Sequence, residues 1–350
     1  MKKFLMSILP QSPSGKTDRP WTKETNPMPS LLPNGKTWPK ISIIMPSYNQ
    51  RIFIEQAIRS VVCQNYPYTE LIIIDGGSND GTVDVIKHYE PWIAYWVSER
   101  DRVMAEALNK GFRHATGELI GWQNTDDFYG QDSFWACAQI ATEYPNYDIY
   151  HGRTYFVDVD GRITGEISSG EFDLAERAES FPLIDMPNQS IFFRRSVLGD
   201  QQFVDESYRC GMDTELVTRL ILASRRTKYV SGITGHYRIH RNAKTFTDGS
   251  TSAVEACRLC FETLQRRDLS QNLRIKMLKG FNKMLINLFR RGDACQFRSY
   301  LIKYWSIAKK DRFDINLAAR FGISLFGNTM LKWLLRATIR ENRTVSFTNK

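Results

Sequence analysis

Apolar runs and amphipathic stretches alternate through the first third of the chain. Four apolar runs predict buried strands, at residues 41–45, 70–74, 92–98 and 118–123. Between these runs, apolar residues recur every three or four positions, which predicts helices over 53–63, 82–89 and 103–115. Strands that alternate with helices are typical of a mostly parallel sheet flanked by helices. The pattern therefore predicts an α/β fold.

The pattern changes in the rest of the chain. Residues 130–250 mix both periods, with helices expected near 132–143 and 213–224 and strands near 147–157, 188–194 and 227–238. Beyond residue 250 the pattern is helical and rich in Lys and Arg. Residues 10–40 hold seven of the 13 prolines, as in a linker. We therefore expect a disordered arm or linker at 1–40, the α/β domain at 41–250 and a basic helical C-terminal region at 251–350.

Polar segments follow the four expected strands of the first third. They are residues 46–49, 75–78, 98–101 and 124–127. In open parallel sheets ligands bind beyond the carboxyl ends of the strands, so we expect these segments to converge on one edge. Two of the side chains there, Asp126 and Asp127, repel each other unless a cation or a proton lies between them. The pair predicts a site for Mg²⁺ or Mn²⁺, and the metal would hold a diphosphate.

Other side chains on this edge suit the rest of a nucleotide. Tyr48 offers a flat ring on which a nucleobase could stack, although such a ring can also be core packing. Asp75 could accept a hydrogen bond from the base or the ribose, or it could only cap the turn that follows it. Lys110 could supply positive charge nearby. Base, ribose, metal and diphosphate together predict a nucleoside-diphosphate ligand.

Charge is unevenly distributed along the chain. The net charge of +9 combines +5 over residues 1–40, −10 over residues 41–257 and +14 over residues 258–350. The basic end could be a helical subdomain with solvated charges, or helices that lie on an anionic membrane surface, and no motif supports nucleic-acid binding. No run of 18 apolar residues predicts a spanning helix, and six scattered cysteines indicate a reducing compartment. We therefore expect a cytoplasmic protein, with peripheral attachment to the inner membrane face as a hypothesis.

Several motifs in order resemble one known family. ISIIMPSYNQ, SVVCQNYPYTELIIIDGGSNDGT and SERDRVMAEALNKGFRHATGELIGWQNTDD resemble the family 2 glycosyltransferases, which have the GT-A fold. The resemblance extends from about Ile41 to His240. It implies transfer of a sugar from a nucleotide-sugar donor, with inversion at the anomeric carbon and usually a divalent metal. UDP is the expected nucleotide, from its frequency in the family.

The resemblance also implies roles for particular residues. The family's metal motif corresponds to Asn124-Thr125-Asp126, followed by Asp127, and its general base corresponds to Asp213 in CGMDTELVTRL. Asp213 could instead only cap the helix that it begins. His240 could join the metal, although a lone histidine is more often structural. The residues that we expect to bind the nucleotide sugar are Pro46, Ser47, Tyr48, Asp75, Asp101, Lys110, Asn124 and Thr125.

The sequence thus predicts an inverting transferase that moves a sugar to a glycan or a lipid-linked acceptor in surface polysaccharide biosynthesis. Two alternatives stay open. A sugar nucleotidyltransferase also combines a nucleotide-binding sheet with metal carboxylates, although the glycine-rich basic loop expected there is missing after Met45. The second alternative is a degenerate, non-catalytic family member that binds nucleotide at a membrane surface. It stays open because Val103-Met104 departs from the family's usual donor loop.

Overall fold

The computed structural model describes residues 7–167, 170–182, 186–199, 203–223, 225–241, 243, 248–308, 315–325 and 327–328. The described residues form two compact units. The first unit comprises the chain up to Phe172 together with 185–240, and the second comprises 173–184 together with the chain from Arg241. The helical unit therefore includes a short segment from the middle of the sequence. The expected boundary at residue 250 did not include that segment.

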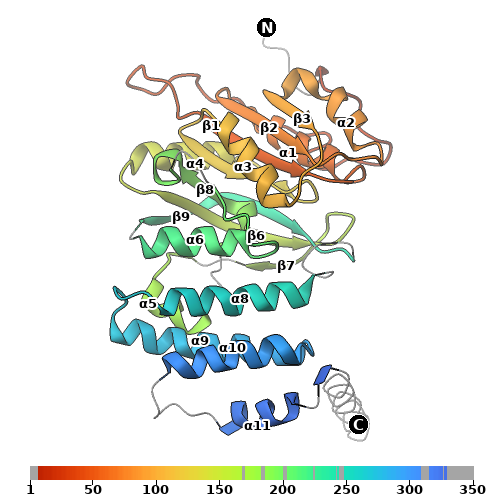
Figure 1. Ribbon diagram of the computed structural model, residues 1–350. Helices are drawn as coiled ribbons and strands as arrows, with labels where there is room; N and C mark the ends of the chain where they lie inside the picture. The colour runs from red at the N-terminus through yellow and green to blue at the C-terminus, as the bar shows by residue number, and fades with distance from the viewer. Residues whose placement is uncertain are drawn as a thin grey trace, which may run out of the picture. The chain divides into compact units, whose positions relative to one another are not determined.

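Four parallel strands begin the first unit, as expected from the apolar runs (Figure 1). They are β1 (Ile41–Ser47), β2 (Thr69–Asp75), β3 (Tyr95–Ser98) and β4 (Leu119–Trp122), in the order β3-β2-β1-β4. They are connected by α1 (Ile54–Val62), α2 (Thr82–His88) and α3 (Met104–His114). β3 begins later than expected, because Pro91 lies in a 3₁₀ turn, η2 (Glu90–Trp92), which delays the strand.

The same sheet continues with strands of mixed direction. The added elements are β5 (Phe128–Tyr129), α4 (Ser133–Glu143), β6 (Ile149–Val157), β7 (Ile163–Ile167), η4 (Asn188–Ser190), β8 (Ile191–Arg194), η5 (Arg195–Val197), α6 (Met212–Leu222) and β9 (Thr227–Arg238). β8 pairs antiparallel with β4 and with β6, whereas β9 pairs parallel with β6 and antiparallel with β5. The structure therefore has a mixed α/β sheet of mostly parallel strands at one end, flanked by helices.

Burial explains why the first strands read as continuous apolar runs. Every residue of β1 is buried, as expected of a strand with both faces covered. α3 lies closely on this strand, since a Cβ at Gly111 would come within 2.6 Å of the Ile44 side chain. A larger residue there would force the Ile44 side chain to shift, so Gly111 allows α3 to lie close to β1.

The N-terminal segment is more ordered than its composition indicates. Leu9 and Trp38 belong to the hydrophobic core, and Trp21 is buried under the guanidinium of Arg59, at 5.3 Å from the ring centroid. Arg59 is fully buried in α1 and donates to the carbonyl of Pro10. Residues 7–40 therefore pack on the first unit, because widely spaced apolar side chains and one buried cation hold a proline-rich segment in place.

We expect Trp21→Ala to release this segment. The free energy of unfolding should fall by about 2 kcal/mol, below the ~3–5 kcal/mol typical of a tryptophan in the centre of a core. Limited proteolysis should then cut within residues 7–40 well before the rest of the chain. Lys23→Ala, a change at an exposed position of the same segment, is the control, and the protease should cut this variant at the wild-type rate. Equal cleavage rates for the two variants would show that Trp21 does not anchor the segment.

The second unit is helical. It consists of α5 (Leu174–Arg177), η3 (Ala178–Ser180), α8 (Gly249–Leu264), α9 (Gln271–Arg290), α10 (Ala294–Ile307) and α11 (Ile315–Ser324). α8, α9 and α10 lie side by side (Figure 1). Lysines of α9 contact the short helical segment: Lys279 pairs with Glu179 at 2.7 Å, and Lys276 and Lys283 donate to the carbonyls of Ala175 and Glu179. These lysines of the basic region therefore hold two segments of the second unit together.

Two further observations bear on the basic region. Residues 309–312 of the basic sequence lie outside the described residues, so the structure says nothing of them. Among the helices of the described residues, none is both long enough and apolar enough to cross a bilayer.

Candidate active site

The strand ends meet on one edge, as the alternating pattern predicts. In the parallel register Ser47 lies beside Asp75, and Asp75 lies beside Ser98. The segment after β4 is attached to the same edge, since the Thr125 hydroxyl donates to the carbonyl of Pro46 at 3.3 Å. Pro46 and Thr125 therefore position the backbone between two groups of side chains, one around the turn after β2 and one after β4.

Asp75 organises the turn that follows it. This fully buried carboxylate accepts hydrogen bonds from the amides of Gly77 (3.2 Å) and Ser78 (2.8 Å). It also accepts from the hydroxyls of Ser78 (2.5 Å) and Ser98 (2.6 Å). Four donors match the acceptor capacity of a carboxylate. The turn-forming alternative therefore describes what Asp75 does in this structure, and its contact with a nucleotide stays a prediction.

Tyr48 is exposed beside that turn. Its side chain is 61% accessible, so core packing is the wrong interpretation of this ring. The ring edge lies 3.4 Å from the place that a Cβ would take at Gly76. The hydroxyl oxygen of the neighbouring Ser47 is buried and has no partner in the described contacts. An exposed ring next to an unpartnered hydroxyl is an arrangement that a planar polar ligand could use.

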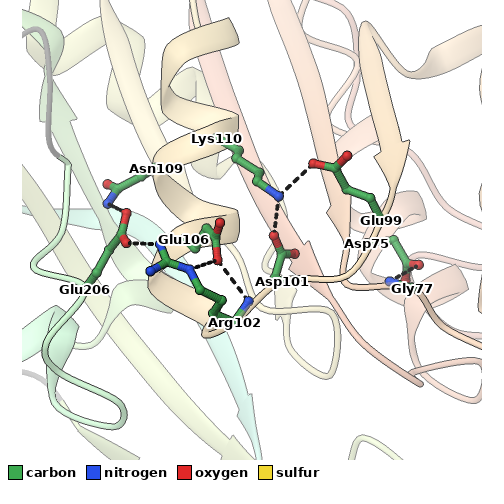
Figure 2. A network of polar contacts seen from close by, with 9 residues as sticks. All are labelled: Asp75, Gly77, Glu99, Asp101, Arg102, Glu106, Asn109, Lys110 and Glu206. Carbon is green, nitrogen blue, oxygen red and sulfur yellow. Dashed lines mark hydrogen bonds and ion pairs between the residues drawn. The ribbon is translucent and has the colours of Figure 1, made fainter.

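Asp101 is held by Lys110 on the other side of the turn. Figure 2 shows Lys110 of α3 reaching both Asp101 (2.6 Å) and Glu99 (2.7 Å). Burial raises the pKa of Asp101, while the ammonium of Lys110 opposes this rise, and the two carboxylates raise the pKa of Lys110. The second oxygen of Asp101 is buried without a partner, 3.6 Å from the Cβ position at Gly76. Lys110 therefore orients Asp101, which can accept a hydrogen bond from a ligand.

A polar network ties the loop before α6 to α3. Arg102 pairs with Glu106 and with Glu206, both at 3.0 Å (Figure 2). The amide of Asn109 donates to Glu206 (3.1 Å) and to the carbonyl of Val204, and its oxygen accepts from two backbone amides of the same loop. Asn109 was not among the expected residues. The signal in the sequence was a polar residue on the buried face of a helix.

The two adjacent carboxylates after β4 have different surroundings. Asp127 is 1% exposed, and its oxygens accept from Gln189 (2.7 Å), Asn124 (3.3 Å) and the backbone amide of Arg238 (2.7 Å). Burial and the neighbouring Asp126 raise the pKa of Asp127. Three N–H groups occupy the oxygens that were expected to hold a cation. Asp127 is therefore placed as a structural acceptor, and a metal between the two carboxylates stays a prediction.

Asp126 faces a histidine. Its carboxylate lies 3.1 Å from Nε2 of His240, and its side chain is 18% exposed. Oxygen and imidazole nitrogen are both ligands of divalent cations in proteins. In the described part of the chain, no three His, Cys, Asp or Glu side chains lie close enough to hold a metal by themselves. A metal here would take two protein ligands and complete its coordination with ligand and water oxygens.

Arg238 contacts both residues of the pair, through its backbone amide to Asp127 and through its guanidinium to the backbone of Asp126. It is 1% exposed, and its guanidinium donates to the backbone carbonyl of Asp126 at 2.8 Å and to the side chain of Gln56 at 2.7 Å. The guanidinium also lies over the ring of Phe53, 4.7 Å from its centroid. In this segment only His240 was named in the sequence analysis. A buried arginine cannot be recognised from sequence when its partners come from distant segments.

Asp213 lies in the first turn of α6. Its carboxylate is half-buried and accepts a hydrogen bond from the amide of Thr214 at 2.7 Å. Gly211 is the N-cap of α6, and Asp213 is the second residue of the helix, so Asp213 does not cap it as the sequence alternative expected. The role of Asp213 as a base stays a prediction.

Comparisons with known proteins identify the family. Residues 42–201 match the family model "Glycosyl transferase family 2". An uncharacterized glycosyltransferase of Mycobacterium tuberculosis is 30% identical over 188 residues, which cover 53% of this chain and 70% of that protein. The GalNAc(5)-diNAcBac-PP-undecaprenol beta-1,3-glucosyltransferase of Campylobacter jejuni is 23% identical over 313 residues, which cover 86% of this chain and 98% of that protein.

A solved structure agrees on the fold. Residues 1–349 of S. aureus TarS, in complex with UDP-GlcNAc, superpose with a TM-score of 0.64 at 15% identity, over 87% of this chain and 92% of that one. At this identity the likeness shows the fold alone, which is the GT-A glycosyltransferase fold. The family match and the Mycobacterium tuberculosis relative add the activity class, so this chain belongs to glycosyltransferase family 2.

Proposed function

We propose that the chain transfers a sugar, with inversion, from a UDP-sugar to a glycan or a lipid-linked acceptor in surface polysaccharide biosynthesis. The observation that carries this proposal is the edge of the sheet, where Tyr48 and Asp101 lie around the turn after β2 and Asp126 faces His240 after β4. The Campylobacter jejuni relative is named for a lipid-linked acceptor, and the S. aureus neighbour binds UDP-GlcNAc. Both names support the proposal.

The nucleotide end of the donor would bind around the turn after β2. Tyr48 would stack on the base, since most of its side chain is exposed. The unpartnered oxygen of Asp101 would accept an N–H or O–H of the nucleoside, and the unpartnered hydroxyl of Ser47 would bind nearby. Each of these buried polar atoms lacks a hydrogen-bond partner within the described residues, which costs free energy. A ligand that supplied the missing hydrogen bond would remove this cost.

The diphosphate end would lie beside Asp126 and His240. Mg²⁺ or Mn²⁺ fits this pair of oxygen and nitrogen ligands, and when bound it would neutralise negative charge on the departing diphosphate. Asn124 accepts from Trp122 at 2.9 Å and donates to Asp127, so it fixes the loop. Arg238 holds the backbone of Asp126 from behind. These contacts position the carboxylate of Asp126 before any ligand arrives.

Asp213 would act on the acceptor. Its carboxylate would take the proton of an acceptor hydroxyl, whose oxygen then forms the bond to the anomeric carbon. The bond from that carbon to the diphosphate breaks on the opposite face, so the configuration inverts and no covalent intermediate with the protein forms.

An anionic membrane surface as an additional partner stays a prediction, and sedimentation with anionic and neutral liposomes would test it.

Calorimetric titration of UDP and GDP, with and without Mn²⁺, tests the donor site. We expect UDP to bind in the presence of Mn²⁺ and to bind at least tenfold more weakly to Asp126→Ala and to His240→Ala, because each change removes one metal ligand. Asp84→Ala, an exposed carboxylate of α2, is the matched control and should bind like wild type. A folded protein that binds neither nucleotide would refute the proposed donor site.

A further inference from the structure

A cavity of about 650 Å³ lies within the first unit. Its wall is formed by residues 14–19, 128–131 and 160–163, together with Trp21, Gln56 and His236. Residues 14–21 precede the part of the chain that the family model matches. The donor site described above does not use any of these side chains.

The cavity and the Asp126 site share a wall. Phe128, in the cavity wall, follows Asp127 directly in the sequence. The guanidinium of Arg238 bridges the two places, because it donates to the carbonyl of Asp126 and to the side chain of Gln56 in the wall. The same guanidinium donates to the carbonyl of Val159, next to residues 160–163. A ligand in the cavity would therefore lie next to the proposed diphosphate site, separated from it by one buried side chain.

One wall of the cavity carries a partly buried cation. Arg19 donates to the hydroxyl of Thr25 (3.2 Å) and to the carbonyl of Cys63 (3.3 Å), which are neutral acceptors. Burial lowers the pKa of Arg19, and the charge of Asp132 opposes this shift without cancelling it. Burial of a guanidinium that donates only to neutral acceptors is costly. An anionic group on a ligand would offset this cost.

Two more cationic residues, both exposed, line the same cavity. Lys16 lies with its ammonium 5.9 Å from the centroid of the Trp21 ring. Arg162 belongs to the β6–β7 hairpin and pairs with Asp160 at 3.3 Å in an exposed, solvent-screened contact. With Arg19, three cationic side chains from two separate segments face one cavity, against the carboxylates of Asp18 and Asp160.

The remaining wall is aromatic and neutral. His236 stacks on Phe128, with ring centroids 4.3 Å apart. Burial lowers the pKa of His236 to about 4, so the imidazole is neutral at pH 7. Gln56 and Gln131 add amides that can bind hydroxyl groups. The stacked rings form a rigid neutral wall, and the amides suit the hydroxyls of a sugar ring.

We propose that this cavity is a second saccharide site, which binds a sugar unit that carries a carboxylate or a phosphate. The unit would belong to the acceptor or to the growing glycan, and this assignment rests on the proposed transferase function. Arg19, Lys16 and Arg162 bind the anionic group, while the amides of Gln56 and Gln131 bind the hydroxyls of the ring.

Ligand-binding measurements on the full chain test the proposal. The probes are tetragalacturonate for the carboxylate, glucose 6-phosphate for the phosphate, and maltotetraose as the neutral saccharide. In saturation-transfer NMR and calorimetry, we expect one acidic probe to bind while maltotetraose does not. The variant Lys16→Gln/Arg162→Gln should bind that probe about tenfold more weakly or worse, because it loses two charged donors. Arg19 is left unchanged, because its bonds hold the N-terminal segment in place.

The matched control is Lys23→Gln/Lys36→Gln. It removes the same charge from exposed positions of the N-terminal segment and should bind like wild type. Binding of neither acidic probe, equal binding of maltotetraose, or equal loss in both double variants would overturn the second site. UDP affinity, measured on the same samples, should be unchanged in Lys16→Gln/Arg162→Gln. A normal UDP affinity without acidic saccharide binding would refute the second site and leave the donor site intact.

Discussion

Replacing Asp213 with Asn should lower the turnover of sugar transfer by roughly 10²–10⁴-fold. The amide keeps the shape of the side chain and can still accept from the backbone amide of Thr214, but it cannot take a proton from the acceptor hydroxyl. Affinity for UDP should stay unchanged, because the proposed nucleotide contacts lie at the strand ends and not in α6. Turnover is measured by release of UDP from UDP-sugar in the presence of an acceptor extract, and affinity by calorimetry.

A matched amide change in the same helix serves as the control for Asp213. Glu215 lies one half-turn further on and pairs with Arg219 at 2.8 Å. Glu215→Gln removes a carboxylate from the first turn of α6 without touching the proposed base, so turnover should change little. Near-wild-type turnover in Asp213→Asn, by a folded protein, would refute the role of this residue as the base. No turnover in wild type with any donor, despite UDP binding, would support the degenerate alternative.

Asp127→Ala should destabilise the first unit by about 3–5 kcal/mol. The change leaves three N–H donors without their acceptor: Gln189, Asn124 and the buried backbone amide of Arg238. Urea unfolding followed by circular dichroism measures the loss. Asp84→Ala should change the free energy of unfolding by less than about 0.5 kcal/mol, as exposed changes usually do.

The pH dependence of this effect has a defined sign. Burial and Asp126 raise the pKa of Asp127, so the folded protein holds a proton there more readily than the unfolded chain, where the pKa of Asp is ~3.9. The stability that this group contributes is then lost as the pH rises through the folded value. With EDTA present, the difference between wild type and Asp127→Ala should be larger at pH 5 than at pH 8. A difference that grows with pH would show that the N–H donors outweigh burial and keep the carboxylate ionised.

The order of strands and helices could be predicted because each element carries its own signal. β1 and β2 are buried on both faces, so they read as continuous apolar runs, and α1 and α3 show a clear helical period. A parallel sheet brings all strand ends to one edge. For this reason the convergence of Ser47, Asp75 and Ser98 follows from the sequence alone, as does the neighbouring position of the segment after β4.

The roles of individual carboxylates on that edge were not predictable in the same way. Asp75 carries the expected charge, but its four donors come from its own turn and from β3, which no pattern in the sequence reveals. Composition likewise predicted a disordered N-terminal segment. Trp21 and Arg59 lie far apart in the sequence, and their contact depends on how α1 packs. Single anchors of this kind leave no periodic signal.

Asp126 and Asp127 illustrate where prediction from sequence ends. They are adjacent and chemically identical, so sequence could only treat them as a pair that shares one cation. In the folded chain Gln189 and the amide of Arg238 surround Asp127, whereas Asp126 faces His240. Those partners arrive from segments more than 60 residues away in sequence. Local pattern specifies the elements and the edge they share, while long-range contacts assign each side chain its surroundings and therefore its chemistry.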